Sequence, residues 1–232
     1  MDLADEKCAA AEAAALLVED GMTVGLGTGS TVAYLLTALA RRRLTILCVA
    51  TSVATESAAR ALGLRVEPFG TEGLDRLDRL DIAIDGADQI DPDGWLVKGG
   101  GGAHTREKIV AASADRFVVI ADSSKTVAAI NGPIPVELLA FGLASTLRRE
   151  PHLRVRDAAP PSPDGGVVGD WFGPVGDGPG PLATRLAAVA GIVEHGLFPP
   201  SLVHDVLVAN GAAIADVVHR RIGPSIGRST PI

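Results

Sequence analysis

The chain has 232 residues, of which 47% are hydrophobic and 3% aromatic, a size that suits one large α/β domain or one domain with a smaller appendage. Its formal net charge of −7 argues against a general nucleic-acid binder, because affinity for the phosphate backbone needs clustered Lys and Arg. No apolar run approaches the roughly 20 residues that span a bilayer, the acidic first residues do not resemble a signal peptide, and only two cysteines are present, so we expect a cytoplasmic protein without membrane contact.

The predicted elements alternate between helices and strands over the first half of the chain. An Ala-rich helix over 4–20 ends at Gly21, and a strand over 23–27 leads into a helix over 30–42. Further strands are predicted at 45–50, 65–69, 81–85, 95–98 and 117–121, and further helices at 52–62 and 105–113. Such alternation with short connections favours a Rossmann-like, doubly wound, mainly parallel sheet, in which ligands bind beyond the carboxyl ends of the strands.

The second half of the chain has a different texture. Short helices and strands are predicted at 141–149, 166–171, 182–189 and 191–197, the second of them inside a Pro- and Gly-rich stretch, and a last strand at 205–209. We therefore expect a smaller α+β lobe over residues 132–205, inserted into a Rossmann-like catalytic domain made of residues 1–131 and 206–232.

A glycine-rich segment, GLGTGST, occupies residues 25–31, where the strand predicted at 23–27 leads into the helix predicted at 30–42. Glycines allow backbone N–H groups to approach an anion, and the N-terminus of a helix adds a partial positive charge. The segment lacks the lysine of a P-loop, the third glycine of a dinucleotide fingerprint and the acidic residue that would bind a ribose. A single phosphate fits best, and an ordinary glycine-rich turn is the alternative.

Two acidic side chains and a lysine form the second candidate group. Asp85 and Asp88 follow an apolar strand, where neighbouring carboxylates can separate their pKa values and move protons. Lys98 precedes four glycines, where it could stabilise an oxyanion, and Glu107 on the first turn of the next helix could be a general base. The alternatives are an Asp-rich turn and an acid that balances the helix dipole.

No metal or cofactor is expected. The acidic stretch after Asp88 fails the EF-hand pattern, and His104 has no second histidine at ligand spacing. Lys125, after the strand at 117–121, could reach a phosphate, although a solvated loop lysine is the simpler interpretation on this residue alone.

Taken together and in order, these stretches resemble ribose-5-phosphate isomerase type A. The matching stretches are GLGTGST, ATS with a following TE, DGAD, KGGGGAHTREK, ADSSK, PIPVEL and a late GLF. The resemblance implies interconversion of ribose 5-phosphate and ribulose 5-phosphate through a cis-enediolate, without metal or cofactor, in the non-oxidative branch of the pentose phosphate pathway. It also implies a homodimer or homotetramer.

The resemblance assigns roles to particular residues. Glu107 would move a proton between C1 and C2, Asp85 would assist ring opening and exchange hydroxyl protons, and Lys98 with the glycine backbone would stabilise the enediolate. Contacts with the phosphate and the sugar would come from Lys7, Thr28, Gly29, Ser30, Thr31, Asp88, Gly99, Gly100, Gly101 and Lys125.

Besides Gly102, which stands where Ala is common, two positions depart from the family's usual residues. Gln89 stands where Glu is common, and His104 stands where Leu is common, three residues before Glu107. His104 would tune Glu107 or contact a different sugar. The alternatives to the main hypothesis are therefore a divergent member acting on another sugar phosphate, and a non-catalytic sugar-phosphate sensor.

Overall fold

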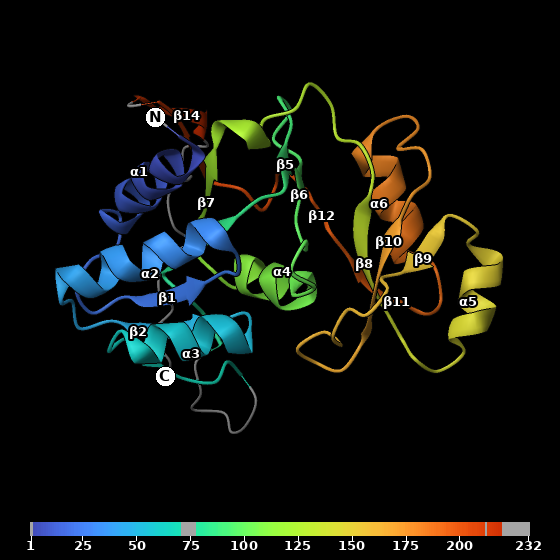
Figure 1. Cartoon of the computed structure of the whole chain (residues 1–232), viewed down its shortest axis with the longest axis horizontal. Coiled ribbons are helices and arrows are strands. Elements are labelled where there is room, and N and C mark those ends of the chain that lie inside the picture. The colour runs from blue at the N-terminus through green and yellow to red at the C-terminus, as the bar shows by residue number, and fades with distance from the viewer. Residues whose placement is uncertain (1, 71–77, 212, 220–232) are drawn as a thin grey trace, which may run out of the picture.

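The structure, a computed structural model, describes residues 2–70, 78–211 and 213–219. The described strands include a large sheet in the order β14, β13, β7, β4, β1, β2, β3 (Figure 1). In that order the strands are Ala213–His219, Asp205–Asn210, Phe117–Asp122, Ile82–Gly86, Thr23–Leu26, Leu47–Ala50 and Arg65–Val66. Neighbours pair in parallel from β13 to β3, and β14 pairs antiparallel with β13 at the edge. The predicted Rossmann-like, mainly parallel sheet is confirmed.

Helices cover both faces of this sheet. On one face, α1 (Leu3–Ala15) and α2 (Ser30–Arg42) pack against Ile82 and Ile84 of β4. On the other face, α4 (His104–Ala112) packs in the cluster that contains Ala83 of the same strand. Successive side chains of a strand point to opposite faces, so a strand buried on both sides is apolar throughout rather than alternating. This explains why β4 and β7 could be predicted as continuous apolar runs. A further helix, α3 (Val53–Ala61), connects β2 to β3.

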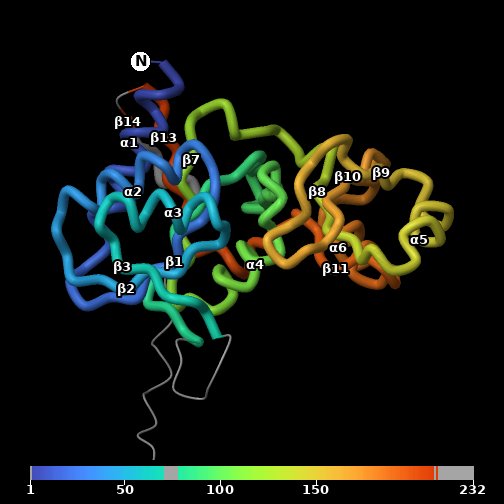
Figure 2. Tube along the Cα trace, turned by 60° about the horizontal axis from the view of Figure 1, so that its bottom comes forward, coloured from blue at the N-terminus to red at the C-terminus, as the bar shows by residue number. Residues whose placement is uncertain are grey.

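A smaller antiparallel sheet lies to one side of the large one (Figures 1 and 2). Its strands, in spatial order, are β11 (Ile192–His195), β8 (Ile134–Leu138), β10 (Val167–Trp171) and β9 (Leu153–Val155). The helices α5 (Leu143–Arg149) and α6 (Pro179–Ala187) belong to the same part of the chain, and Trp171 and Leu186 lie in its separate apolar core. We call residues 132–205 the lobe. The last predicted strand, β13, then lies beside β7 in the large sheet.

Three short strands connect the two sheets. They are β12 (Leu197–Phe198), β6 (Leu96–Val97) and β5 (Gln89–Ile90), in that spatial order. The predicted strand over 95–98 is therefore shorter than expected and lies outside the large sheet. Because β12 pairs with β6, the end of the lobe lies directly beside the residue that follows β6, which is Lys98.

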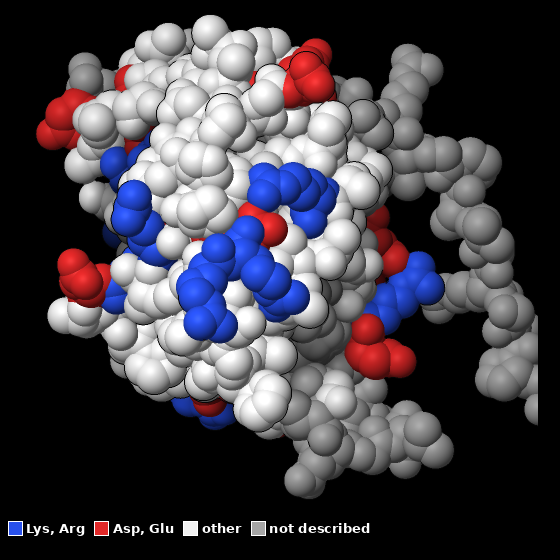
Figure 3. Space-filling model, turned by 90° about the vertical axis from the view of Figure 1, so that its right-hand side faces the viewer, with Lys and Arg blue, Asp and Glu red and all other residues white. Residues whose placement is uncertain are grey.

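Basic side chains gather at the far end of the lobe, around an acidic one (Figure 3). Arg185 of α6 pairs with Glu150 at 2.5 Å, and its guanidinium lies over the ring of Trp171. Arg149 of α5 donates to the carbonyl of Ala190. Arginine stacks well on aromatic rings, so the contacts of Arg185 fasten α6 to the small sheet and to the end of α5.

The first helix is shorter than predicted, because α1 ends at Ala15 rather than near Gly21. Arg42, at the end of α2, donates to the carbonyls of Ala15 and Val18. Carbonyls at a helix end need partners, and a cationic side chain from a neighbouring helix supplies them here. The strands β5, β8, β9 and β14 were not predicted. Among the described residues, no helix is both long enough and apolar enough to cross a bilayer. Part of the expected domain segment 206–232, residues 212 and 220–232, lies outside the described residues.

Candidate active site

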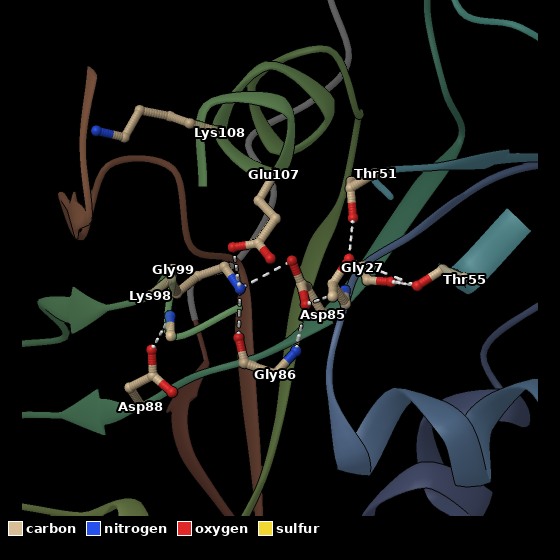
Figure 4. A network of polar contacts seen from close by, with 12 residues as sticks. Gly27, Thr51, Thr55, Asp85, Gly86, Asp88, Lys98, Gly99, Glu107 and Lys108 are labelled. Carbon is tan, nitrogen blue, oxygen red and sulfur yellow. Dashed lines mark hydrogen bonds and ion pairs between the residues drawn. The ribbon is translucent and has the colours of Figure 1, made fainter. Parts of the chain in front are cut away.

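Three ionisable side chains from three separate elements meet at the edge of the large sheet (Figure 4). Asp85 lies near the end of β4, Lys98 follows β6, and Glu107 is on the first turn of α4. The Lys98 Nζ lies 2.8 Å from Asp85 Oδ2, 3.2 Å from Glu107 Oε2, and 2.7 Å from the carbonyl oxygen of Gly86. All three side chains are at most 4% exposed. One buried ammonium thus faces two buried carboxylates.

The Asp85 carboxylate is fixed by backbone as well as by Lys98. Its Oδ1 accepts hydrogen bonds from the N–H groups of Thr28 (3.1 Å) and Gly86 (2.7 Å). The end of β1 must come very close for this, and a Cβ added at Gly27 would collide with the Asp85 carboxyl group. Gly27 is therefore required by close approach, which is one of the reasons for a glycine at the end of a strand.

The Glu107 carboxylate is less well satisfied. Its approach to Lys98 is an ion pair without the geometry of a hydrogen bond, and Oε2 has no hydrogen-bond partner among the described residues. The neighbouring Lys108 points away from the cluster (Figure 4) and pairs with Glu194 at 2.7 Å. Glu107 thus shares a single cation with Asp85, and it has fewer donors.

Burial and charge set the protonation of the cluster. Burial raises the pKa of Glu107 to about 8; Lys98 opposes this rise, and the nearby charge of Asp85 adds to it. Burial also raises the pKa of Asp85 against the opposing effect of Lys98 and of the N–H donors. Burial tends to lower the pKa of Lys98, but the two carboxylates outweigh it and raise the value overall. A glutamate with a pKa near neutrality, beside a permanently charged lysine, is well suited to accept a proton from carbon.

A cavity of about 140 Å³ opens above this cluster. It is lined by Thr28, Gly29, Ser30, Thr31, Gly86, Ala87, Asp88, Lys98, Gly99, Gly100, Gly101, Glu107 and Lys125. At one end lies the start of α2, where the N-cap residue is Gly29 and no side chain caps the helix. Free N–H groups at a helix N-terminus bind anions. The cavity therefore has an anion-binding end and a proton-transfer end.

Threonine hydroxyls support the anion-binding end. Thr28 Oγ1 lies 2.8 Å from Thr51 Oγ1, and Thr55 donates to the carbonyl of Gly27 at 2.9 Å. Thr51 and Thr55 were not among the predicted site residues. Their only signal in the sequence was the ATS stretch with its following TE, which did not indicate a role for either hydroxyl.

Two predicted site residues do not line the cavity. Asp85 lies beneath it, in contact with Lys98 rather than with the open space. Lys7, expected to bind phosphate, pairs with Asp122 at 2.9 Å, next to the short 3-10 helix η1 (Ser123–Lys125). Lys7 is thus near Lys125 in the fold, but in this structure its ammonium belongs to an ion pair.

The two unusual positions also lie outside the cavity. Gln89 exchanges two hydrogen bonds with the backbone of Asn131, at 2.8 and 3.0 Å, and so fixes the segment that leads into the lobe. His104 is completely buried, and its Nε2 lies 3.3 Å from the carbonyl oxygen of Glu194. Burial lowers the pKa of His104 to about 4, so the ring is neutral near neutral pH. Neither residue is among those that line the cavity.

Among the described residues, no group of three or more His, Cys, Asp and Glu side chains is arranged to hold a metal ion.

Comparisons with known proteins agree on one family. The family model described as ribose 5-phosphate isomerase A (phosphoriboisomerase A) matches residues 47–212. A ribose-5-phosphate isomerase A from Methanosarcina acetivorans is 46% identical over 207 residues, which cover 83% of this chain and 86% of that protein. The chain belongs to the ribose-5-phosphate isomerase A family. The resemblance seen in the motifs is confirmed, and with it the expectation of an enzyme of the isomerase class.

Solved structures of this family share the whole fold. A ribose 5-phosphate isomerase A from Neisseria gonorrhoeae superposes with a TM-score of 0.86 at 27% identity, over 95% of this chain and 99% of that one. A D-ribose-5-phosphate isomerase in complex with phospho-erythronic acid gives a TM-score of 0.84 at 29% identity, over 95% of this chain and 100% of that one. The lobe and the large sheet together are thus the architecture of the ribose-5-phosphate isomerase A family.

Proposed function

We propose that the chain interconverts D-ribose 5-phosphate and D-ribulose 5-phosphate through a cis-enediolate, in the non-oxidative branch of the pentose phosphate pathway. The observation that carries the proposal is the single buried lysine shared by Asp85 and Glu107, below a cavity whose other end is an uncapped helix N-terminus. An acid–base reaction on a small anionic molecule would use both ends of such a cavity.

In this proposal the phosphate lies at the start of α2, within reach of Ser30, Thr31 and Lys125. Helix N–H groups and a lysine bind a phosphate dianion but do not discriminate between the sugars attached to it. The anchored phosphate places the other end of the open-chain sugar over Lys98 and Glu107. The small cavity of about 140 Å³ suits one small metabolite, since pockets for drug-sized ligands start at about 300 Å³.

Glu107, as the carboxylate, takes the proton from C2 of the aldose and returns it to C1. The negative charge that develops on the oxygens is stabilised by Lys98 and by the backbone N–H groups of Gly99 and Gly101, whereas Gly100 holds Asp88 in place. Asp88, whose Oδ2 accepts from the N–H of Gly100 at 2.8 Å, is proposed to bind sugar hydroxyls. Asp85 is proposed to assist ring opening and to exchange hydroxyl protons, and its contact with Lys98 gives it a route to the substrate oxygens.

The proposal extends to the state of the protein. We propose a homodimer or homotetramer, supported by Leu139 and Phe141 after β8, which are 51% and 92% exposed. We also propose a cytoplasmic location, supported by the free thiols of Cys8 and Cys48. The division into a catalytic domain of 1–131 and 206–232 and a lobe of 132–205 is part of the same proposal.

Lys7 stays a proposed phosphate ligand, which requires it to leave Asp122 when substrate binds.

The test is a panel of aldose phosphates assayed for ketose formation in EDTA, with Glu107→Gln beside wild type. We expect ribose 5-phosphate to be the best substrate, and Glu107→Gln to lower kcat by about 10³-fold or more while binding persists. Glu56→Gln is the matched control, because Glu56 is also an acidic residue in the first turn of a helix. If Glu107 only balanced the helix dipole, both variants would behave alike.

The other results have clear meanings. Binding of ribose 5-phosphate without any ketose would indicate a sensor, and faster turnover of another sugar phosphate would indicate a divergent isomerase. Either result would overturn the proposed reaction.

A further inference from the structure

One arginine of the lobe contacts the four consecutive glycines beside the cavity, residues 99–102, which we call the glycine run. Arg156 follows β9, and its guanidinium donates to the carbonyl oxygens of Gly100 at 2.8 Å and Gly99 at 3.2 Å. The same guanidinium makes two hydrogen bonds of 2.7 Å each to the two carboxylate oxygens of Asp170 on β10. Asp170 is buried and the Arg156 side chain is 22% exposed. All three guanidinium nitrogens therefore have partners, and the side chain is fixed.

Fixing these carbonyls fixes the N–H groups of the cavity wall. In a trans peptide unit, the C=O and the N–H point in opposite directions. Arg156 on the carbonyl of Gly99 therefore directs the N–H of Gly100 toward Asp88, which accepts it at 2.8 Å. By the same geometry, Arg156 on the carbonyl of Gly100 sets the direction of the N–H of Gly101, which lines the cavity.

The glycine run needs such a restraint. Four consecutive glycines have the most backbone freedom of any sequence, and that freedom must be removed before their N–H groups can stabilise a charge. Within the glycine run itself, the N–H of Gly102 donates to the carbonyl of Gly99, which restrains part of the backbone. On the His104 side, a Cβ at Gly99 (φ +101°) would collide with the imidazole ring. Arg156 supplies the restraint from the lobe, and its charge polarises the two peptide units.

We propose that Arg156, oriented by Asp170, is a positioning residue for the isomerisation. It holds the Gly99–Gly101 backbone so that the N–H of Gly100 stays on Asp88 and the N–H of Gly101 meets the charge that develops on the substrate. The lobe then contributes to the reaction although none of its residues touches the reacting atoms. This inference rests on the proposed function, because it assigns a role within that reaction.

A second arginine pair offers a matched control. Arg106 of α4 makes hydrogen bonds of 2.8 and 2.6 Å to the two carboxylate oxygens of Asp164, and one of 3.3 Å to the carbonyl of Pro163. This pair also joins the lobe to the rest of the protein, but it does not contact the glycine run. If Arg156 merely fastened the lobe, losing either arginine would have the same effect.

The experiment compares Arg156→Met, Arg156→Lys and Arg106→Met with wild type, in full-length protein. We expect Arg156→Met to lower kcat about 10- to 100-fold with KM changed by less than about threefold, since misplacing catalytic groups by an ångström costs about that much. Arg156→Lys keeps the positive charge but loses the planar guanidinium with its several donors, so its kcat should lie between those of Arg156→Met and wild type. Arg106→Met keeps kcat near the wild-type value.

A second readout does not depend on turnover. Hydrogen exchange of the peptide that covers Gly99–Gly102 is expected to be faster in Arg156→Met than in Arg106→Met, at equal thermal stability. Equal kcat values and equal exchange in the two variants would overturn the inference. If wild type forms no ketose, the proposed function fails, and the exchange data still decide whether Arg156 orders the run. Should Arg156→Met not fold, Arg156→Lys against Arg106→Lys gives the same comparison.

Discussion

Replacing Glu107 by Gln should make the protein more stable while removing its proposed activity. Glu107 and Asp85 share one buried lysine, so the fully ionised cluster has one uncompensated negative charge in a site with little access to water. A buried charge without its own partner is strongly unfavourable. Glutamine keeps the shape of Glu107 and leaves Lys98 and Asp85 as a balanced pair.

The size of the effect follows from the pKa of Glu107. Burial raises it from the ordinary 4.5 to about 8, and at 1.36 kcal/mol per pKa unit this corresponds to about 5 kcal/mol as an upper limit. The sign depends on pH. Below about pH 4.5 Glu107 is protonated in the folded and unfolded states and costs nothing. As the pH rises from there through 8, the unfolded state loses its proton first, and the folded state loses stability. The helix-dipole benefit of an acid at this position, about 0.3–1 kcal/mol, is too small to reverse this.

Urea unfolding at about pH 5, 7 and 9 measures the difference directly. Glu107→Gln should exceed wild type by several kcal/mol at about pH 9, and the gap should nearly close at about pH 5. Glu56→Gln, on α3, loses only an exposed pair with Arg60 and should stay within about 0.5 kcal/mol of wild type at every pH. A Glu107→Gln protein less stable than wild type at high pH, or a gap independent of pH, would refute the buried-charge argument.

Three further predictions concern the same site. The kcat/KM for ribose 5-phosphate should fall with unit slope as the pH drops below about 8, the pKa of Glu107, because the base must be ionised; a flat profile in stopped assays between about pH 6 and 9 would contradict this. His104→Leu should keep kcat and KM within about threefold of wild type and raise the thermal midpoint, because it removes a buried Nδ1 without a hydrogen-bond partner among the described residues; a tenfold loss of kcat would assign His104 a role in the reaction. Gly27→Ala should lower kcat by about 100-fold by displacing Asp85, whereas Gly25→Ala, which crowds Val110 in the core, should lower stability by about 1–3 kcal/mol and spare kcat of the folded protein.

The large sheet could be predicted because its signals are local. Strands such as Ile82–Gly86 and Phe117–Asp122 are apolar on both faces, and the alternation with helices fixes the parallel arrangement. The end of α1 could not be predicted, because Leu16 to Val18 continue an Ala- and Leu-rich pattern. At its end, Arg42 from another element donates to the carbonyls of Ala15 and of Val18, three residues further on. Tertiary contacts of this kind have no local signature.

The candidate site also has a part that could be predicted from the sequence and a part that could not. Thr28 follows β1 and Asp85 lies near the end of β4, and a parallel sheet brings such positions to one edge, so their convergence was predictable from the order of elements. The approach of Lys98 was not, because β6 lies outside the large sheet. The burial of Asp85 beneath Lys98 was not, because it depends on the approach of Gly27 from another strand. Arg156 lies just before the Pro- and Gly-rich stretch, with no motif around it. Its contact with Gly99 and Gly100 depends on the placement of the lobe.

The unequal charge of the cluster links its stability to its chemistry. In a balanced pair of Lys98 and Asp85 alone, each charge would be satisfied by the other, and neither group would have reason to take up a proton from the substrate. The third charge is on Glu107, whose Oε2 has no hydrogen-bond donor among the described residues and whose pKa burial raises to about 8, so it takes a proton readily. A proton accepted from substrate carbon removes the uncompensated charge at the moment when a new one develops on the substrate oxygens beside Lys98. The free energy that Glu107 costs the folded protein is thus the same free energy that makes it a base, and the two properties cannot be separated by any substitution at this position.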